Sequence, residues 1–132
     1  MIQNGSFYLK RSQMIQNFGK IFFGVTIINK PLSTPLLEYF TKLCSAASPR
    51  ATLKCAESLS NTDFRDELHT IKVPTLIIHG DDDKNVPIEL SSKKTAEAIA
   101  DNTFIVYEGA PHGLFYTERE KLNNDLLNFL NS

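Results

Sequence analysis

The sequence has no tryptophan, only two cysteines and no long apolar run among its 132 residues. Its longest largely apolar stretch, Ile21–Ile28, is far shorter than the roughly 20 residues that a membrane-spanning helix needs. The first residues lack the charged, apolar and small-residue order of a secretory signal peptide. Cys44 and Cys55 form no C-x-x-C pair and have no neighbouring histidine, which favours reduced thiols over a disulfide or a metal site. These absences predict a cytoplasmic protein with no membrane partner.

An excess of charge of one sign is missing as well. Lysine and arginine total 14, aspartate and glutamate total 15, and the formal net charge is −1. A surface without a basic excess does not attract a nucleic-acid backbone, so no nucleic-acid partner is expected. With 42% hydrophobic and 22% charged residues, the composition is that of a globular protein long enough for one domain with a core.

Residues 1–60 predict helices and no convincing strand. In the segment 13–25, apolar residues recur at intervals of three and four, as they do on one face of a helix. Pro35 suits the first turn of a second helix, and Ser48 followed by Pro49 suits the start of a third. Helices without strands predict a cap segment that covers another part of the protein.

Residues 61–132 predict an alternation of strands and helices. The first strand, "TLIIH", is a continuous β-branched run typical of a strand buried on both faces of a parallel sheet. In order, the expected elements are a short helix in "TDFRDEL" capped by Thr62 or Asp63, a strand over Thr75–His79, a helix over 87–100, a strand over Thr103–Glu108 and a helix over 117–132. This order predicts a right-handed βαβ unit of an α/β fold.

Two parallel strands are too few for a self-contained sheet. Both strands have the composition of interior strands, and a two-stranded sheet would leave long apolar edges exposed. We therefore expect the chain to be part of a larger fold or to self-associate when it is isolated.

The loops after the two strands contain residues that could take part in catalysis or binding. "GDDDKNVP" carries Asp81, Asp82 and Asp83, and "EGAPHGL" carries His112. Ligands and chemistry in α/β sheets gather at the carboxyl ends of the strands, where neighbouring loops meet. Asp83 and His112 could therefore form a carboxylate–imidazole pair, in which the carboxylate fixes the tautomer of the ring and stabilises its charged form.

Other interpretations of the aspartate cluster stand beside this one. A solvated turn is an ordinary role for aspartate, and the sequence alone leaves it open. A calcium loop counted from Asp81 would need glycine and glutamate where Val86 and Ser92 stand, so it is excluded. A zinc or magnesium site of His79 with the aspartates lacks converging partners elsewhere, and no metal is expected.

The two segments "TLIIHGDDDKNVPIE" and "YEGAPHGLFYTEREKLNNDLLNFL" resemble the C-terminal part of α/β-hydrolases. The most similar group is the bacterial cofactor-free chloroperoxidases, aryl esterases and perhydrolases. The resemblance covers residues 61–132 strongly and Phe7–Leu59 more weakly. It implies the C-terminal portion of that fold, namely a helical cap and the last two parallel strand–helix units. It also implies a site without cofactors, in which Asp83 of H-G-x-x-D-x-x-V-P is the triad acid and His112 of G-A-P-H-G is the catalytic histidine.

The sequence departs from this family pattern in one large respect. No G-x-S-x-G nucleophile elbow occurs anywhere, and the segment that would supply the oxyanion hole is absent too. The resemblance therefore implies a carboxylic ester hydrolase, with perhydrolase or haloperoxidase chemistry as a side activity, that lacks its nucleophile. The alternative is a non-catalytic truncated remnant that self-associates or binds a partner.

A small-molecule ester or acid is the expected substrate if an N-terminal half completes the site. Aromatic side chains of the cap would then wall an acyl or aryl pocket. Simple core packing is the alternative explanation for each of them. The candidates are Phe18, Phe22, Phe23, Tyr39 and Phe40.

Overall fold

The computed structural model describes residues 3–26 and 31–132, with side chains for 10–26 and 31–132. The chain divides into two compact units. We call Met1–Lys20 with Pro31–Asp63 the helical unit, and Ile21–Lys30 with Phe64–Ser132 the sheet unit. The boundary expected between residues 60 and 61 stays a prediction. Residues 1, 2 and 27–30 of the expected cap segment lie outside the described residues.

The helical unit is built from helices with clear start signals. Ser33 and Ser48 cap α2 and α3 through their side-chain oxygens, and Pro35 and Pro49 occupy the first turns. Proline is favourable there because the first helical N–H groups have no intrahelical partner. The helices are α1 (Gln3–Phe22), which ends in the sheet unit, α2 (Thr34–Ala46) and α3 (Pro49–Asn61). The predicted starts of the second and third helices are confirmed.

Helices α1 and α2 approach each other closely at Gly19. A Cβ atom on Gly19 would lie 2.9 Å from the ring of Phe40 and 3.0 Å from the side chain of Leu37, so glycine permits the contact. Arg11 makes a second connection, because its guanidinium donates to the carbonyls of Ser45 (2.8 Å) and Ala47 (2.9 Å). These bonds satisfy carbonyl groups at the C-terminal end of α2.

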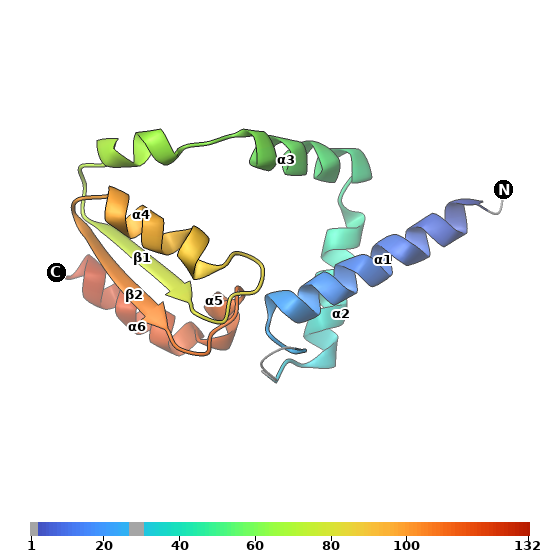
Figure 1. Cartoon of the computed structure of the whole chain (residues 1–132). Helices are drawn as coiled ribbons and strands as arrows, with labels where there is room; N and C mark the ends of the chain where they lie inside the picture. Colours follow the sequence, from blue (N-terminus) through green and yellow to red (C-terminus); the bar gives the residue numbers. More distant parts are fainter. Residues whose placement is uncertain (1–2, 27–30) are drawn as a thin grey trace. The chain divides into compact units, whose positions relative to one another are not determined.

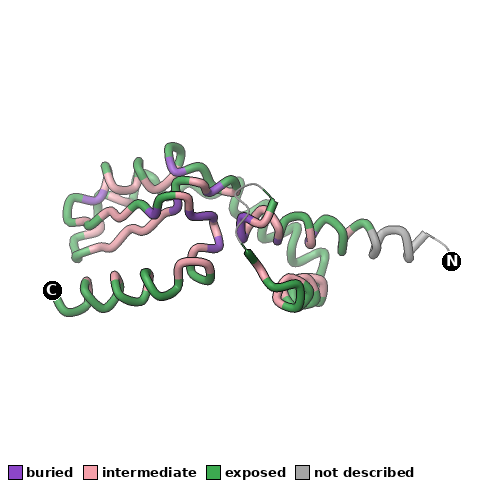
Figure 2. The backbone as a smooth tube through the Cα atoms, turned by 90° about the horizontal axis from the view of Figure 1, so that it is seen from below, coloured by how far each residue is buried: buried purple, intermediate pink, exposed green. Residues whose placement is uncertain are grey.

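The sheet unit contains two parallel strands, as the sequence predicts. Their register runs from Thr75 opposite Asn102 to Gly80 opposite Tyr107. Figures 1 and 2 together show α4 on one face of this sheet and α6 on the other. The elements are η1 (Arg65–Thr70), β1 (Thr75–Gly80), η2 (Ile88–Leu90), α4 (Ser92–Ala98), β2 (Asn102–Tyr107), α5 (Leu114–Thr117) and α6 (Arg119–Leu130).

Three helix predictions need correction. The expected short helix is a 3-10 turn, and its N-cap is Phe64 rather than Thr62 or Asp63. The helix expected over 87–100 is interrupted because the backbone of Ser91 (φ −132°, ψ −95°) leaves the helical region, so η2 and α4 are separate. The terminal helix begins at Arg119, after the separate short helix α5.

Burial is concentrated at the carboxyl ends of the strands. Tyr107, Ala110 and Pro111 are almost fully buried there, and Asp83 is only 5% exposed. The strands themselves are mostly intermediate in exposure, and most of α6 is exposed (Figure 2). Among the apolar residues of α6, Leu130 is 75% exposed. The loops that carry Asp83 and His112 therefore contain several of the most buried residues of the sheet unit.

Candidate active site

The loops after β1 and β2 are joined by backbone hydrogen bonds. Asp81 N donates to Tyr107 O (3.1 Å), and Asp82 N donates to Ala110 O (3.2 Å). The carboxylate of Asp81 accepts a hydrogen bond from Gly109 N at 2.6 Å. Asp81 therefore acts as a turn residue, and it fixes the histidine loop against the aspartate loop. Asp82 forms an ion pair with Lys84 at the surface.

Gly80 permits the close approach of these loops. A Cβ atom on Gly80 would lie 2.1 Å from the carbonyl oxygen of Ala110, a distance at which no side chain fits. Gly109 has a different role, since its φ of 63° is a left-handed conformation that glycine adopts without strain. The two glycines thus set the separation of the loops and the turn of the histidine loop.

Asp83 is a buried carboxylate whose oxygens each have partners. Oδ1 accepts hydrogen bonds from Asn85 N (2.8 Å) and Val86 N (2.9 Å). Oδ2 lies 2.6 Å from Nδ1 of His112, although the two residues are far apart in the sequence. Such donors satisfy a carboxylate that burial would otherwise destabilise. The structure therefore brings together the two residues that the sequence singled out.

The hydrogen bond to Asp83 determines the tautomer of His112. Since the carboxylate is an acceptor, Nδ1 carries the proton, and Nε2 of the neutral ring is left with a lone pair. The His112 side chain is 34% exposed, so it is accessible from solvent. The ring of Phe22 packs edge-on against it with centroids 4.8 Å apart, and Phe22 O accepts a hydrogen bond from Gly113 N. This arrangement can accept a proton at Nε2 and stabilise the resulting charge through Asp83.

A second histidine contacts Asp83. His79 Nε2 lies 3.2 Å from Asp83 Oδ2 and 2.9 Å from Val86 O, while its Nδ1 lies 2.5 Å from the hydroxyl of Ser92. Sequence reasoning considered His79 only as a metal ligand and missed this role. The available signal was its position, directly before the glycine that begins the Asp83 loop.

A cavity of about 220 Å³ opens beside the two histidines. It is lined by Ile78, His79, Gly80, Asp83, His112, Leu114 and Phe115. Phe23 lies near this region, only 4% exposed, with its ring centroid 6.3 Å from that of Phe115. The cavity thus combines a polar end at the Asp83–His112 pair with apolar and aromatic walls.

The predicted pocket aromatics belong to different units. Phe22 and Phe23 lie in the sheet unit near His112, as described above. The other three lie in the helical unit, where Tyr39 is 60% exposed and Phe40 contacts Gly19. Phe18 lines a cavity of that unit of about 390 Å³. Whether any of the five contacts a substrate stays a prediction.

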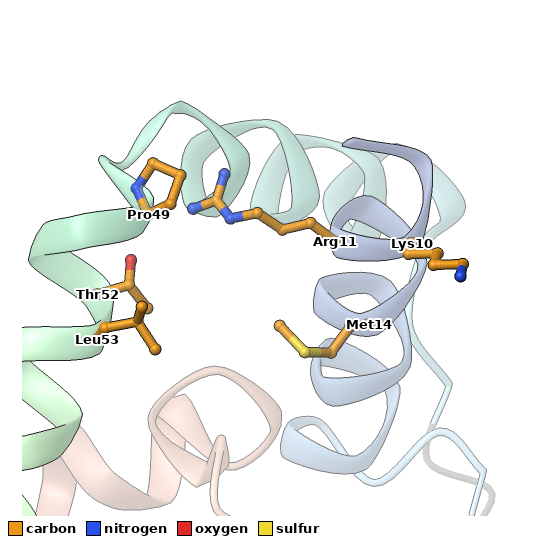
Figure 3. Close-up of a pocket in the computed structure, with 6 residues that line it drawn as sticks. All are labelled: Lys10, Arg11, Met14, Pro49, Thr52 and Leu53. Carbon is orange, nitrogen blue, oxygen red and sulfur yellow. The ribbon is translucent and has the colours of Figure 1, made fainter. Parts of the chain in front are cut away.

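Another cavity of the helical unit, also of about 390 Å³, lies between α1 and the start of α3 (Figure 3). Met14 and Leu53 face each other across it, and Arg11 lies at its edge (Figure 3). The guanidinium of Arg11 is already bonded to the carbonyls that end α2. The cavity is therefore an apolar space beside Arg11, whose guanidinium has a structural role.

Tyr107, the last residue of β2, anchors α6 to the sheet. Its hydroxyl donates a hydrogen bond to Asp125, and Lys121 lies over its ring, 3.9 Å from the centroid. Burial, followed by the hydrogen bond to Asp125 and the negative charges of Asp125 and Glu118, raises the pKa of Tyr107 above its ordinary value. This tyrosine stays protonated and serves as a structural donor.

Within residues 3–26 and 31–132, no group of three or more histidine, cysteine and acidic side chains is arranged to hold a metal ion. Cys44 and Cys55 are both free thiols. None of the helices described has the length and apolar character needed to cross a membrane. The cytoplasmic location expected from the sequence stays a prediction.

Comparison with known proteins gives consistent matches. The family model described as serine aminopeptidase, S33 (Hydrolase_4) matches residues 38–120. A bifunctional esterase/perhydrolase from Acinetobacter calcoaceticus is 38% identical over 111 residues, which cover 84% of this chain and 40% of that protein. A non-heme chloroperoxidase from Kitasatospora aureofaciens is 33% identical over 124 residues, which cover 92% of this chain and 45% of the chloroperoxidase.

Among solved structures, the crystal structure of bromoperoxidase from Bacillus anthracis matches with a TM-score of 0.87 and 39% identity. That match covers 92% of this chain and 44% of the bromoperoxidase. The chain thus spans less than half the length of each of these relatives. The chain belongs to the serine aminopeptidase S33 (Hydrolase_4) family and forms a C-terminal portion of an α/β-hydrolase fold.

Proposed function

We propose that this chain supplies the acid and the general base of a serine-type carboxylic ester hydrolase. The observation that carries the proposal is the 2.6 Å hydrogen bond from His112 Nδ1 to the buried carboxylate of Asp83. Two backbone amides hold the other oxygen of that carboxylate, so the acid is oriented before any substrate arrives. Asp83 is then the orienting acid and His112 the general base.

The proposed reaction uses a serine as the nucleophile. As the serine oxygen attacks the ester carbonyl, Nε2 of His112 takes its proton, and Asp83 stabilises the imidazolium. His112 then gives the proton to the departing alcohol, which leaves an acyl-serine. A water molecule attacks this acyl group while His112 again takes and returns a proton, so the carboxylic acid is released and the serine is restored.

We propose that the serine comes from a segment outside this sequence. The sequence has no G-x-S-x-G motif, and the relatives named above are more than twice as long as the part that this chain matches. The first of them are a chloroperoxidase and an esterase/perhydrolase. Perhydrolysis would follow the same steps with hydrogen peroxide replacing water at the acyl-serine. The acyl or aryl group of the substrate would pack against Phe22, Leu114 and Phe115 beside His112.

A chimera tests the two assigned residues. This chain replaces the matching part of the Acinetobacter esterase/perhydrolase, and hydrolysis of p-nitrophenyl esters is measured. We expect His112→Ala and Asp83→Asn each to lower kcat by about four orders of magnitude, as loss of the orienting acid does in other triads. Asp82→Asn is the matched control, since the carboxylate of Asp82 pairs with Lys84 at the surface, and it should leave kcat unchanged. Full activity of the His112→Ala chimera would overturn the assignment.

The chain alone tests the origin of the nucleophile. After incubation with an excess of a fluorophosphonate probe, intact mass should show no adduct, and no ester should be hydrolysed. A single adduct that disappears in His112→Ala would mean that the chain contains its own nucleophile. Ser92 would be the first serine to map in that case, because its hydroxyl lies 2.5 Å from an imidazole nitrogen of His79.

A second proposal concerns the isolated chain, which we propose self-associates. Within the part of the chain that the structure describes, each strand of the two-stranded sheet pairs with the other along one edge only. Helix α6 also exposes apolar side chains to water, which is unfavourable for a monomer. The exposed fractions are 40% for Leu126, 58% for Leu127 and 75% for Leu130. Size-exclusion chromatography with light scattering should therefore give a mass above 14.9 kDa. A folded monomer at micromolar concentration would contradict the proposal.

A further inference from the structure

Besides His112, a second imidazole holds the carboxylate of Asp83. The side chain of His79 is only 11% exposed, and its Nε2 lies 2.9 Å from Val86 O and 3.2 Å from Asp83 Oδ2. We propose that His79 is a positioning residue, which keeps the Asp83 loop in the geometry that the bond to His112 requires. The inference rests on the proposed function in one respect, namely that Asp83 is the triad acid.

The surroundings of His79 fix the position of its proton. Both atoms near Nε2 are oxygen acceptors, so Nε2 carries the hydrogen. Nδ1 then accepts a hydrogen bond from the hydroxyl of Ser92, 2.5 Å away, where α4 begins. Helix α4 thereby orients His79, and His79 orients the Asp83 loop. This is how an outer hydrogen-bonded partner fixes a functional side chain.

The bonds of Val86 explain why the Asp83 loop needs this connection. Val86 N and Asn85 N hold Asp83 Oδ1, but these amides belong to the same loop as Asp83. They therefore orient the carboxylate within its loop and do not fix the loop to the sheet. The bond from His79 to Val86 O supplies that connection, because His79 is a residue of β1. The bonds of Asp81 and Asp82 to the histidine loop fix the start of the Asp83 loop, whereas the bond from His79 fixes the part of the loop that follows Asp83.

The test compares two substitutions of His79 in the full 132-residue chain. His79→Gln keeps an N–H donor near the position of Nε2, whereas His79→Leu keeps the bulk and removes the donor. Nuclear magnetic resonance would follow the Nδ1 proton of His112, and hydrogen exchange would follow the amides of Asn85 and Val86. In His79→Leu we expect the Nδ1 proton signal of His112 to disappear. We also expect both amides to exchange about tenfold faster than global unfolding explains, because the loss of one hydrogen bond changes an equilibrium by about that factor. His79→Gln should retain the signal and the slow exchange.

The matched control is His69→Leu, because His69 is an exposed histidine on η1 of the same unit. It should change neither measurement. If His79→Leu leaves both as in the original chain, or changes them only in proportion to global stability, His79 is a structural residue and the inference is wrong. If that variant does not fold, Ser92→Ala, which removes the hydrogen bond to His79, takes its place in the hydrogen-exchange measurement. Faster exchange at Asn85 and Val86 would support the inference, and unchanged exchange would overturn it. Neither measurement depends on activity, so failure here is distinguishable from failure of the ester-hydrolysis test.

Discussion

Replacing Asp83 by alanine removes the acceptor of three hydrogen bonds at once, from Asn85 N, Val86 N and His112 Nδ1. The carboxylate is almost fully buried, so water cannot take its place for all three donors. A buried donor that loses its acceptor typically costs about 1–3 kcal/mol. We therefore expect Asp83→Ala, which leaves three donors without their acceptor, to lower the free energy of unfolding by about 4 kcal/mol.

Replacement by asparagine separates the contributions of the two oxygens. Asparagine keeps a carbonyl oxygen that can accept from both backbone amides, but it has no charge to offer His112. The expected loss is about 1.5–3 kcal/mol, the usual value for one hydrogen bond to a charged group. Asp83→Asn should therefore be about 2 kcal/mol more stable than Asp83→Ala, because it keeps the two hydrogen bonds from the backbone amides, which contribute about 1 kcal/mol each.

Urea denaturation of the 132-residue chain, followed by circular dichroism, measures these differences. Asp82→Ala is the control, since its surface ion pair with Lys84 should contribute less than about 0.5 kcal/mol. The reasoning would be refuted if Asp83→Ala were no more destabilising than Asp82→Ala. Equal losses for Asp83→Ala and Asp83→Asn would refute the part assigned to the two amides.

Two further predictions concern the loops and the sheet. Gly80→Ala should lower the free energy of unfolding, measured in urea, by about 3 kcal/mol or more, because its Cβ would meet the carbonyl of Ala110. Gly109→Ala meets nothing within 4 Å and should cost only the left-handed backbone strain of about 1 kcal/mol. Similar losses for the two variants would contradict the close approach at Gly80. Tyr107→Phe should cost about 1.5 kcal/mol near neutral pH, because the bond to Asp125 is lost. The pKa of Tyr107 is raised by folding, so this contribution is fully present below the ordinary tyrosine pKa of about 10 and is lost as the pH rises further. The difference in unfolding free energy between the two proteins should therefore shrink above about pH 10, and a constant difference would contradict the shift.

Local sequence signals accounted for most of the elements of this chain. Ser48 and Pro49 mark the start of α3 because capping and the first helical turn involve only neighbouring residues. The β-branched runs mark both strands for the same reason. The meeting of Asp83 and His112 was also predictable, since parallel strands bring their carboxyl ends to one edge of the sheet. The helix break at Ser91 was not predictable, because the residues around it have good helical periodicity.

The sequence by itself therefore determined the order of strands and helices, and it predicted that Asp83 and His112 could meet. Tertiary structure alone decided that Ser92 reaches His79, that His79 holds the Asp83 loop, and that Phe22 packs on His112. These contacts join separate elements, and each depends on how closely the elements pack. Periodicity and capping specify a helix or a strand, but they contain no information on the distance between two side chains that the fold brings together.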